Sequence, residues 1–111
     1  MTSMNKQIPD WLILWIWNSL LGEIYPNIRA IAVAFSPDRE LTMRYYLDRN
    51  PTDFDRESIA DVMGNIFANT SSAHDIKSCK EECIYSKSPV GELDALGGLI
   101  YARREYNMAP P

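Results

Sequence analysis

The alternation of apolar and polar residues along the chain predicts two helices and four strands, in the order α-β-β-α-β-β. The clearest helical pattern lies in residues 52–69, where apolar residues recur three and four positions apart. This stripe consists of Ile59, Val62, Met63, Ile66 and Phe67. Thr52 is a natural N-cap, and Asp55 holds the capping-box position three residues later. We therefore expect a helix that buries one side and begins at Thr52.

The most apolar segment is the tryptophan-rich run WLILWIW at residues 11–17. Pro9 suits the first turn of a helix, and Gly22 or Asn27 can end it. Because the run is apolar around most of its circumference, we expect a mostly buried helix with at least one tryptophan partly exposed. It is shorter than the roughly 20 residues that span a membrane, and no signal-peptide pattern surrounds it. We expect no membrane association.

Residues 27–35 and 40–48 alternate as strands around the polar turn at 36–39, which predicts a β-hairpin. In the first strand the small residues Ala30, Ala32 and Ala34 share one side, and we expect a helix to pack closely on that side. In the second strand, one side is apolar and the other carries polar residues. The apolar side consists of Leu41, Met43, Tyr45 and Leu47, and the other side consists of Thr42, Arg44, Tyr46 and Asp48.

The last third of the chain is less clear. Residues 78–87 have a helical composition, but Cys79, Cys83 and Tyr85 alternate with polar residues as in an edge strand. Residues 96–106 predict a final strand. Together these elements predict a single α+β domain over residues 1–111, with an ordered core at about 9–106 and two helices packed on one antiparallel sheet.

Composition narrows the classes of function. The 111 residues are 46% apolar, which is enough for a folded core, and their net charge of −4 argues against a phosphate-binding surface. The two cysteines, Cys79 and Cys83, lie roughly 13 Å apart if the segment is a strand, too far for a disulfide. We expect free thiols in a reducing cytoplasm. The single histidine, His74, lies in a polar loop and lacks the partners of a zinc site or a catalytic base.

Acidic residues crowd the corner YYLDRNPTDFDRE at residues 45–57. They could be helix caps, metal ligands, a catalytic pair or a surface for a basic partner. The spacing lacks the Asp-x-Asp-x-Asp-Gly pattern of a calcium loop, and no phosphate-binding glycine loop is present. The dipole of the helix explains Asp53 and Asp55 in its first turn, but it does not explain Asp48 or Glu57. We expect no catalytic residues, no cofactor and no metal.

What remains is a protein-binding surface, because tyrosine and arginine are common at the centres of interfaces and acidic residues recur near the loops. The first candidate set consists of Arg44, Tyr46, Asp48, Asp53, Asp55 and Glu57. The second candidate patch consists of Glu81, Glu82, Glu92 and Asp94.

Two motifs give the chain a family resemblance that covers about residues 10–106. The corner of the hairpin reads tyrosine-apolar-aspartate, then Pro-Thr-x-x-Asp, and the last strand ends in aromatic-x-Arg-Arg-Glu. The matching residues are Tyr46, Leu47, Asp48, Pro51, Thr52, Asp55, Tyr101, Arg103, Arg104 and Glu105. With these motifs the chain resembles the small immunity proteins of bacterial polymorphic toxin systems, including those of contact-dependent growth inhibition. The Cys-Lys-Glu-Glu-Cys segment matches no feature of that family.

The resemblance implies a cytoplasmic antitoxin, without catalysis, that binds one cognate toxin domain 1:1 and covers its active site. The toxin bound by such an antitoxin is usually a nuclease. A nuclease has a basic substrate cleft, to which an acidic surface of the antitoxin is complementary. It implies no direct contact with nucleic acid and does not indicate which surface binds. Two other classes stay open: a small carboxylate- or metal-dependent hydrolase, and a structural adaptor that docks through its tryptophan-rich helix.

Overall fold

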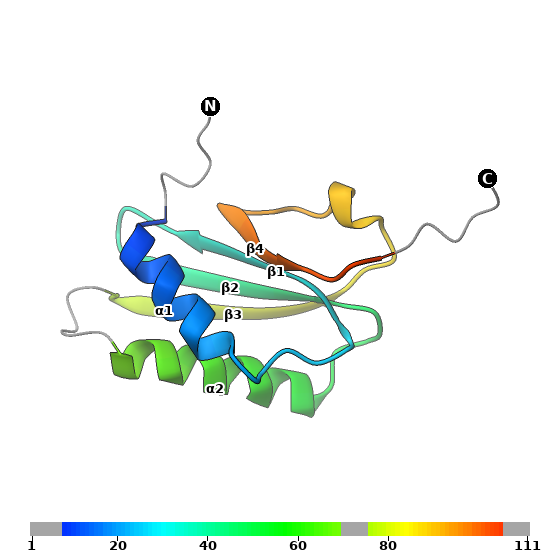
Figure 1. Cartoon of the computed structure of the whole chain (residues 1–111), viewed down its shortest axis with the longest axis horizontal. Coiled ribbons are helices and arrows are strands. Elements are labelled where there is room, and N and C mark those ends of the chain that lie inside the picture. Colours follow the sequence, from blue (N-terminus) through cyan, green and yellow to red (C-terminus); the bar gives the residue numbers. More distant parts are fainter. Residues whose placement is uncertain (1–7, 70–75, 106–111) are drawn as a thin grey trace.

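The computed structural model describes residues 8–69 and 76–105, which form two helices and one four-stranded sheet (Figure 1). In chain order the elements are α1 (Asp10–Leu20), β1 (Ile28–Phe35), β2 (Glu40–Leu47), α2 (Asp53–Asn69), β3 (Ser78–Tyr85), the 3-10 turn η2 (Val90–Glu92) and β4 (Gly98–Ala102). The predicted order α-β-β-α-β-β is confirmed. The prediction for His74 lies outside the described residues. The last strand ends at Ala102, earlier than the predicted end at Tyr106.

The sheet is mixed, so the prediction of an antiparallel sheet is wrong in one respect. Its strand order is β3-β2-β1-β4; β1 pairs antiparallel with β2 and β4, whereas β2 and β3 are parallel. The reason is the helix between β2 and β3. The 17 residues of α2 extend about 25 Å at 1.5 Å per residue, close to the roughly 26 Å of an eight-residue strand. The helix therefore returns the chain to the start of β2, and β3 runs in the same direction.

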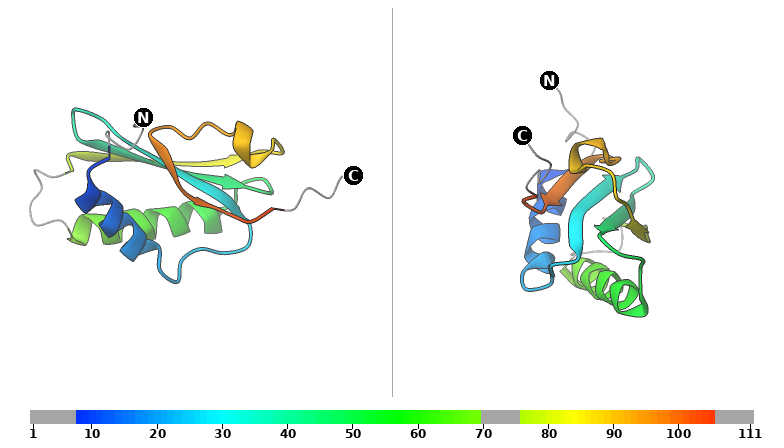
Figure 2. Two further views of the ribbon diagram at one scale, coloured as in Figure 1. Left: turned by 45° about the horizontal axis from the view of Figure 1, so that its top comes forward. Right: turned by 90° about the vertical axis from the view of Figure 1, so that its right-hand side faces the viewer.

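Both helices cover one face of the sheet, and the chain around η2 crosses the other face (Figure 2). The main core joins the inward sides of the helices to one side of the strands. Its members include Leu12 and Ile16 of α1, Ile59, Val62, Met63 and Ile66 of α2, and Ile31, Val33, Leu41, Met43 and Tyr45 of the sheet. The predicted stripe of α2 and the predicted apolar side of β2 are thus confirmed as buried, except that Phe67 is partly exposed.

The alanine side of β1 does not face a helix, which corrects the expectation for that strand. Ala30 and Ala32 are buried under Leu93, Leu96 and Leu99 of the C-terminal segment. A register shift between Ile28 and Ala30 moves Ile28 to the helix side, although strict alternation would place it with the alanines. Small side chains on this face leave room for a segment without regular structure to pack directly on the sheet.

Two element boundaries have local causes. The turn between β1 and β2 closes as predicted, with Arg39 in the left-handed region at φ 64° and its backbone N–H donating to Ser36 O at 2.8 Å. The last strand begins later than predicted because Leu96 also has a positive φ of 56°. Its N–H donates to the Asp94 carboxylate at 2.9 Å, which turns the chain before the strand starts at Gly98.

Candidate functional site

The start of α2 is the local structure that the sequence predicts most closely. The Thr52 backbone N–H donates to Asp55 Oδ2 at 2.7 Å, and the Asp55 N–H donates to Thr52 Oγ1 at 3.4 Å. These reciprocal bonds are a capping box, with aspartate in the position more often held by glutamate. The predicted N-cap is therefore confirmed.

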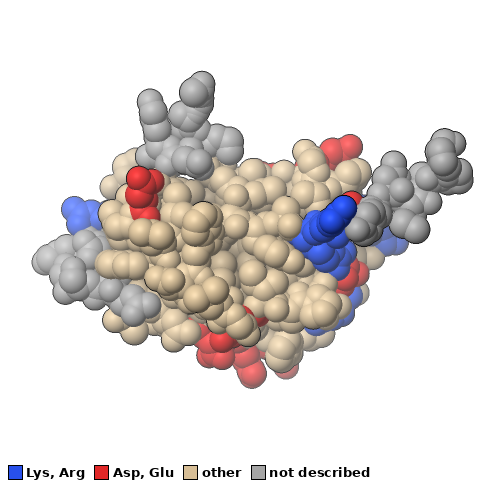
Figure 3. Space-filling model, in the orientation of Figure 1, with Lys and Arg blue, Asp and Glu red and all other residues tan. Residues whose placement is uncertain are grey.

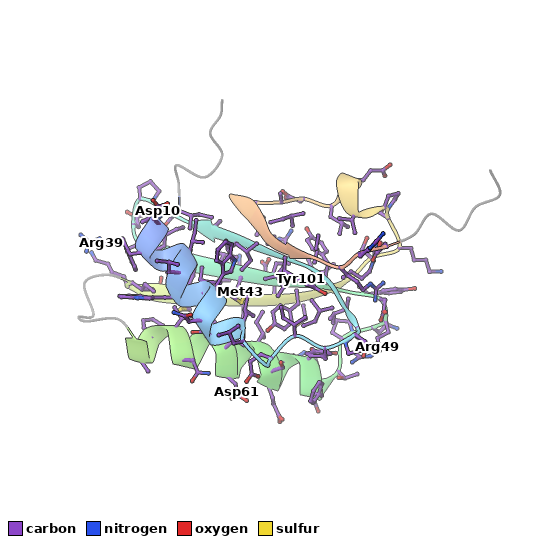
Figure 4. All side chains as sticks on the ribbon, in the orientation of Figure 1. Asp10, Arg39, Met43, Arg49, Asp61 and Tyr101 are labelled. Atoms are coloured by element: carbon purple, nitrogen blue, oxygen red, sulfur yellow. The ribbon has the colours of Figure 1, made fainter. Side chains whose placement is uncertain are left out.

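Asp55 is also the centre of a buried network. The Tyr25 hydroxyl donates to Asp55 Oδ1 at 2.6 Å, and the Arg49 guanidinium forms an ion pair with both carboxylate oxygens. Arg49 lies near the end of α2 where the helix begins (Figure 4). Burial alone would raise the pKa of Asp55, but the bonds from Arg49, Tyr25 and Thr52 outweigh it and hold the pKa well below its usual range. Asp55 is fully buried, so its carboxylate holds the fold together rather than facing solvent.

Asp48 lies at the exposed end of β2 and pairs with a residue far along the chain. Arg103 Nη1 donates to its Oδ2 at 2.8 Å, and Asn27 Nδ2 donates to its Oδ1 at 2.9 Å. The bond from Arg103 is the main cause that lowers the pKa of Asp48. Arg103 also donates to Glu105, which in turn accepts two bonds of 2.8 Å from the buried Arg29. The Arg-Arg-Glu run of the sequence thus ties the C-terminal segment to β1 and β2.

On the face of the sheet opposite the helices, the structure brings members of the two candidate sets together. Arg44 Nε donates to Glu82 Oε1 at 2.7 Å, and Arg44 Nη1 donates to the Tyr46 hydroxyl oxygen at 3.0 Å. That hydroxyl donates to the backbone carbonyl of Asp94 at 2.7 Å. Tyr46 is only 4% exposed, so it anchors the segment that crosses this face. The parallel pairing of β2 with β3 puts Arg44 beside Glu82, which an antiparallel pairing would not predict.

The remaining acidic candidates are exposed. The side chain of Asp53 is 96% exposed and pairs with Arg56 at 3.2 Å on the same helix. Glu57, Glu81, Glu92 and Asp94 also lie at the surface. Of the first candidate set, Asp53 and Glu57 therefore present carboxylates outward from α2, and Asp48 does so from the end of β2.

The sequence reasoning missed three residues that complete a surface around Glu57. Glu23, Phe54 and Asp61 line a shallow hollow together with Glu57, between the α1–β1 connection and α2. Phe54 is 60% exposed, and its ring lies edge-on to the ring of Tyr25 with 5.0 Å between centroids. Figure 3 shows acidic side chains gathered at this lower edge of the molecule. We call Glu23, Asp53, Phe54, Glu57 and Asp61 the α2 acidic surface.

One signal for this surface was present in the sequence. Asp53, Glu57 and Asp61 are spaced four residues apart, which places them in one row on a helix. Like charges at this spacing destabilise a helix by roughly 0.2–0.5 kcal/mol per pair. Phe54 lies outside the buried stripe of α2, so the sequence also predicts that it is exposed. The sequence does not predict that Glu23 belongs to this surface, because only the packing of α1 against α2 brings the α1–β1 connection close to Asp61.

The two cysteines lie on β3, on the side that faces the main core, and both are free thiols. Burial raises the pKa of each thiol to about 11. At neutral pH they are protonated and weakly nucleophilic. Within residues 8–69 and 76–105, no three histidine, cysteine, aspartate or glutamate side chains lie close enough to hold a metal ion. In the same part of the chain, no helix has the length and apolar character to cross a bilayer.

Comparison with known proteins identifies the family. A search of curated proteins returned no match. A comparison with protein families matches residues 9–105 to the family described as MafI2 immunity protein. This match covers the whole described domain, from the start of α1 to the Glu105 side chain that binds Arg29. The chain belongs to the MafI2 immunity protein family.

Proposed function

We propose that this chain neutralises its cognate toxin by binding the toxin domain directly, without catalysis, and by covering the active site of a nuclease. Membership of the immunity protein family implies toxin neutralisation in general. The finer proposal draws on the charge of the chain, −4, and on the placement of its exposed acidic residues. A nuclease has a cationic substrate cleft, and carboxylates that face such a cleft accelerate association and compete for the cations that bind phosphate.

The observation that carries this proposal is the α2 acidic surface. Three of its carboxylates, those of Glu23, Glu57 and Asp61, line a hollow together with Phe54, an exposed aromatic ring that lies edge-on to the ring of Tyr25. An aromatic anchor within a polar rim is typical of a protein-binding surface. Tyr25 is fixed in turn by its bond to Asp55. Asp55 thus has an indirect role in the proposed site, through the position of Tyr25 and the start of α2.

The other candidate residues also divide into possible partner contacts and residues that support the fold. Asp48 lies at the exposed end of β2, where Arg103 and Asn27 bind its carboxylate, and it stays a candidate contact. Arg44, Tyr46 and Glu82 hold the sheet to the segment that crosses it, and we propose that their role is to support the fold. The exposed carboxylates of Glu81, Glu92 and Asp94 remain the second candidate set. Glu92 and Asp94 belong to the segment that crosses the sheet opposite the helices, whereas Glu81 is paired with Met43 and lies on the same side of the edge strand β3 as Cys79 and Cys83.

A comparison of two neutralised variants tests which patch binds. The ligand is the cognate toxin domain in a catalytically inactive form. One variant combines Asp53→Asn, Glu57→Gln and Asp61→Asn; the matched control combines Glu81→Gln, Glu92→Gln and Asp94→Asn, and also removes three exposed charges.

We expect the first variant to associate about tenfold more slowly at low salt, since electrostatic steering changes rates by 10–10³. The difference should shrink as salt is added. The control variant should associate at nearly the wild-type rate. A slower rate for the control alone would transfer the proposal to the second patch. Failure of the wild-type chain to bind or inhibit the toxin would overturn the proposed function itself.

A further inference from the structure

A second surface feature lies beside the α2 acidic surface: an apolar groove between α1 and the edge strand β4. It is lined by Trp17, Leu20, Leu21, Ile24, Ile100 and Tyr101, and its volume is about 340 Å³. Figure 4 shows Tyr101 on the side of the sheet that α1 covers. We call these six residues the α1–β4 groove.

The groove exposes large apolar side chains that the fold does not use. Leu21 is 75% exposed and Trp17 is 52% exposed. The neighbouring tryptophans behave differently: Trp11 and Trp15 pack edge-to-face with centroids 4.9 Å apart, and Trp11 also contacts Phe35. Trp17 is therefore the tryptophan of α1 that points to solvent, and the core does not need it there.

Most of the exposed large apolar residues of the described chain are close to this groove. Leu14, Trp17, Leu21 and Ile24 come from α1 and the connection after it, and Phe54 comes from the adjacent first turn of α2. Contiguous apolar surface of this kind marks interaction sites on soluble proteins. β4 adds an open sheet edge, since it is the last strand in the order β3-β2-β1-β4.

The groove and the acidic surface are continuous, and this decides what kind of partner fits. Ile24 lines both the groove and the hollow that contains Glu23, Glu57 and Asp61. In Figure 3 the surface over α1 is mostly uncharged, and acidic side chains gather along its lower edge. An apolar centre with a charged rim matches the anatomy of a protein interface, and the sign of this rim selects a basic partner. A second copy of the chain would bring an acidic surface of the same sign.

We infer that the α1–β4 groove receives an apolar side chain of the toxin domain, and that lysine or arginine residues flanking this side chain reach the α2 acidic surface. This inference rests on the proposed function and assigns two separate contributions to one continuous interface. The charges increase the rate of association, and burial of Trp17 and Leu21 slows dissociation, because apolar contacts act after the partners have docked.

Single substitutions in the groove test the inference. Leu21→Ser and Trp17→Ser each remove an exposed apolar side chain without a change of charge, and Tyr85→Ser is the matched control. Tyr85 is also an exposed large apolar residue, 37% exposed, but it lies on β3 at the opposite edge of the sheet. Binding to the inactive toxin C-terminal domain is followed by surface plasmon resonance, and the melting temperature of each variant confirms that it is folded.

We expect each groove variant to dissociate at least about tenfold faster than the wild type, with the larger effect for Trp17→Ser, because tryptophan is enriched among the residues that dominate binding. The association rate and its dependence on salt should be unchanged, whereas the neutralised α2 variant should show the opposite pattern. Tyr85→Ser should bind like the wild type.

The outcomes separate the inference from the proposed function. If the wild type binds the toxin and the folded groove variants bind with wild-type dissociation rates, the groove is not part of the interface, and the proposed function stands. If light scattering shows that the free chain is a dimer that Leu21→Ser converts to a monomer, a second copy occupies the groove and the inference is overturned. If the wild type does not bind, both fail together.

Discussion

Replacement of Asp55 by alanine is expected to destabilise the protein far more than replacement of Asp53, although the two residues are neighbours on α2. Asp55 is fully buried and accepts bonds from Tyr25 Oη, from Thr52 N and Oγ1, and from Arg49, whereas the Asp53 side chain is 96% exposed. Loss of the capping interaction alone costs about 1 kcal/mol. Loss of one member of a buried ion pair costs about 3–5 kcal/mol.

The expected magnitude lies near the lower end of that range. Arg49 is partly exposed and can regain water when its partner is removed, so its charge is not left buried. The contributions also belong to one network and do not add. We expect Asp55→Ala to lower the free energy of unfolding by about 3 kcal/mol, which corresponds to a fall in melting temperature of about 15 °C for a domain of this size. Asp53→Ala should change the free energy of unfolding by less than about 0.5 kcal/mol.

Urea denaturation followed by circular dichroism measures both values. A common slope of free energy against urea would show that the two variants unfold the same surface. The reasoning would be refuted if Asp55→Ala unfolded at the same urea concentration as Asp53→Ala. In that case the carboxylate network at the start of α2 would contribute nothing to stability.

The same network predicts a dependence on pH. The pKa of Asp55 is depressed in the folded chain, so the unfolded chain takes up a proton at a higher pH than the folded chain does. The stabilisation is complete above the ordinary aspartate pKa of about 3.9 and is lost as pH falls below it toward the folded value. The free energy of unfolding should therefore fall more steeply below pH 4 for the wild type than for Asp55→Asn. Parallel curves would contradict this assignment.

Three further predictions concern other parts of the chain. Tyr46→Phe removes a hydroxyl that donates one hydrogen bond and accepts another, and it should lower the free energy of unfolding by about 1 kcal/mol in urea titrations; an unchanged midpoint would show that the hydroxyl is dispensable. Glu105→Ala leaves the buried guanidinium of Arg29 without its carboxylate and should lower the free energy of unfolding by about 2 kcal/mol. Glu105→Gln keeps one acceptor and should lower it by less; equal losses for the two variants would refute the role of the ion pair. Burial raises the thiol pKa of Cys79 and Cys83 to about 11 and also limits access to them, so a disulfide reagent at pH 8 should label them at least about tenfold more slowly than glutathione; labelling at the glutathione rate would contradict their burial.

Much of the fold could be predicted from the sequence because it depends on residues close together in the chain. The capping box of α2 joins Thr52 to Asp55, and the hairpin turn joins Ser36 to Glu40. The buried stripe of α2 and the inward side of β2 follow from the fixed periods of helices and strands. The family motifs at the hairpin corner and at the end of the chain are also short runs of neighbouring residues, and they indicated the class of protein that the family comparison shows.

The candidate site was harder to predict because its acidic residues divide by burial. Local rules place both Asp53 and Asp55 in the first turn of α2 and assign Asp55 to the capping box. They do not show that Asp53 faces solvent while Asp55 is fully buried and binds Tyr25, which is 30 residues away in sequence. The direction of β3 decides that Glu82 lies beside Arg44, and the packing of α1 decides that Trp17 faces outward while Trp11 packs on Phe35.

The sequence by itself determined the elements, their order and the presence of an acidic surface without a catalytic motif. The tertiary structure decided which carboxylates are structural and which are available to a partner, and it joined the exposed ones to the apolar groove of α1 and β4. The physical reason is that local bonds depend on the spacing of residues along the chain. Burial and ion pairing, such as the contact of Arg29 with Glu105 across 76 residues, depend on which distant segments meet.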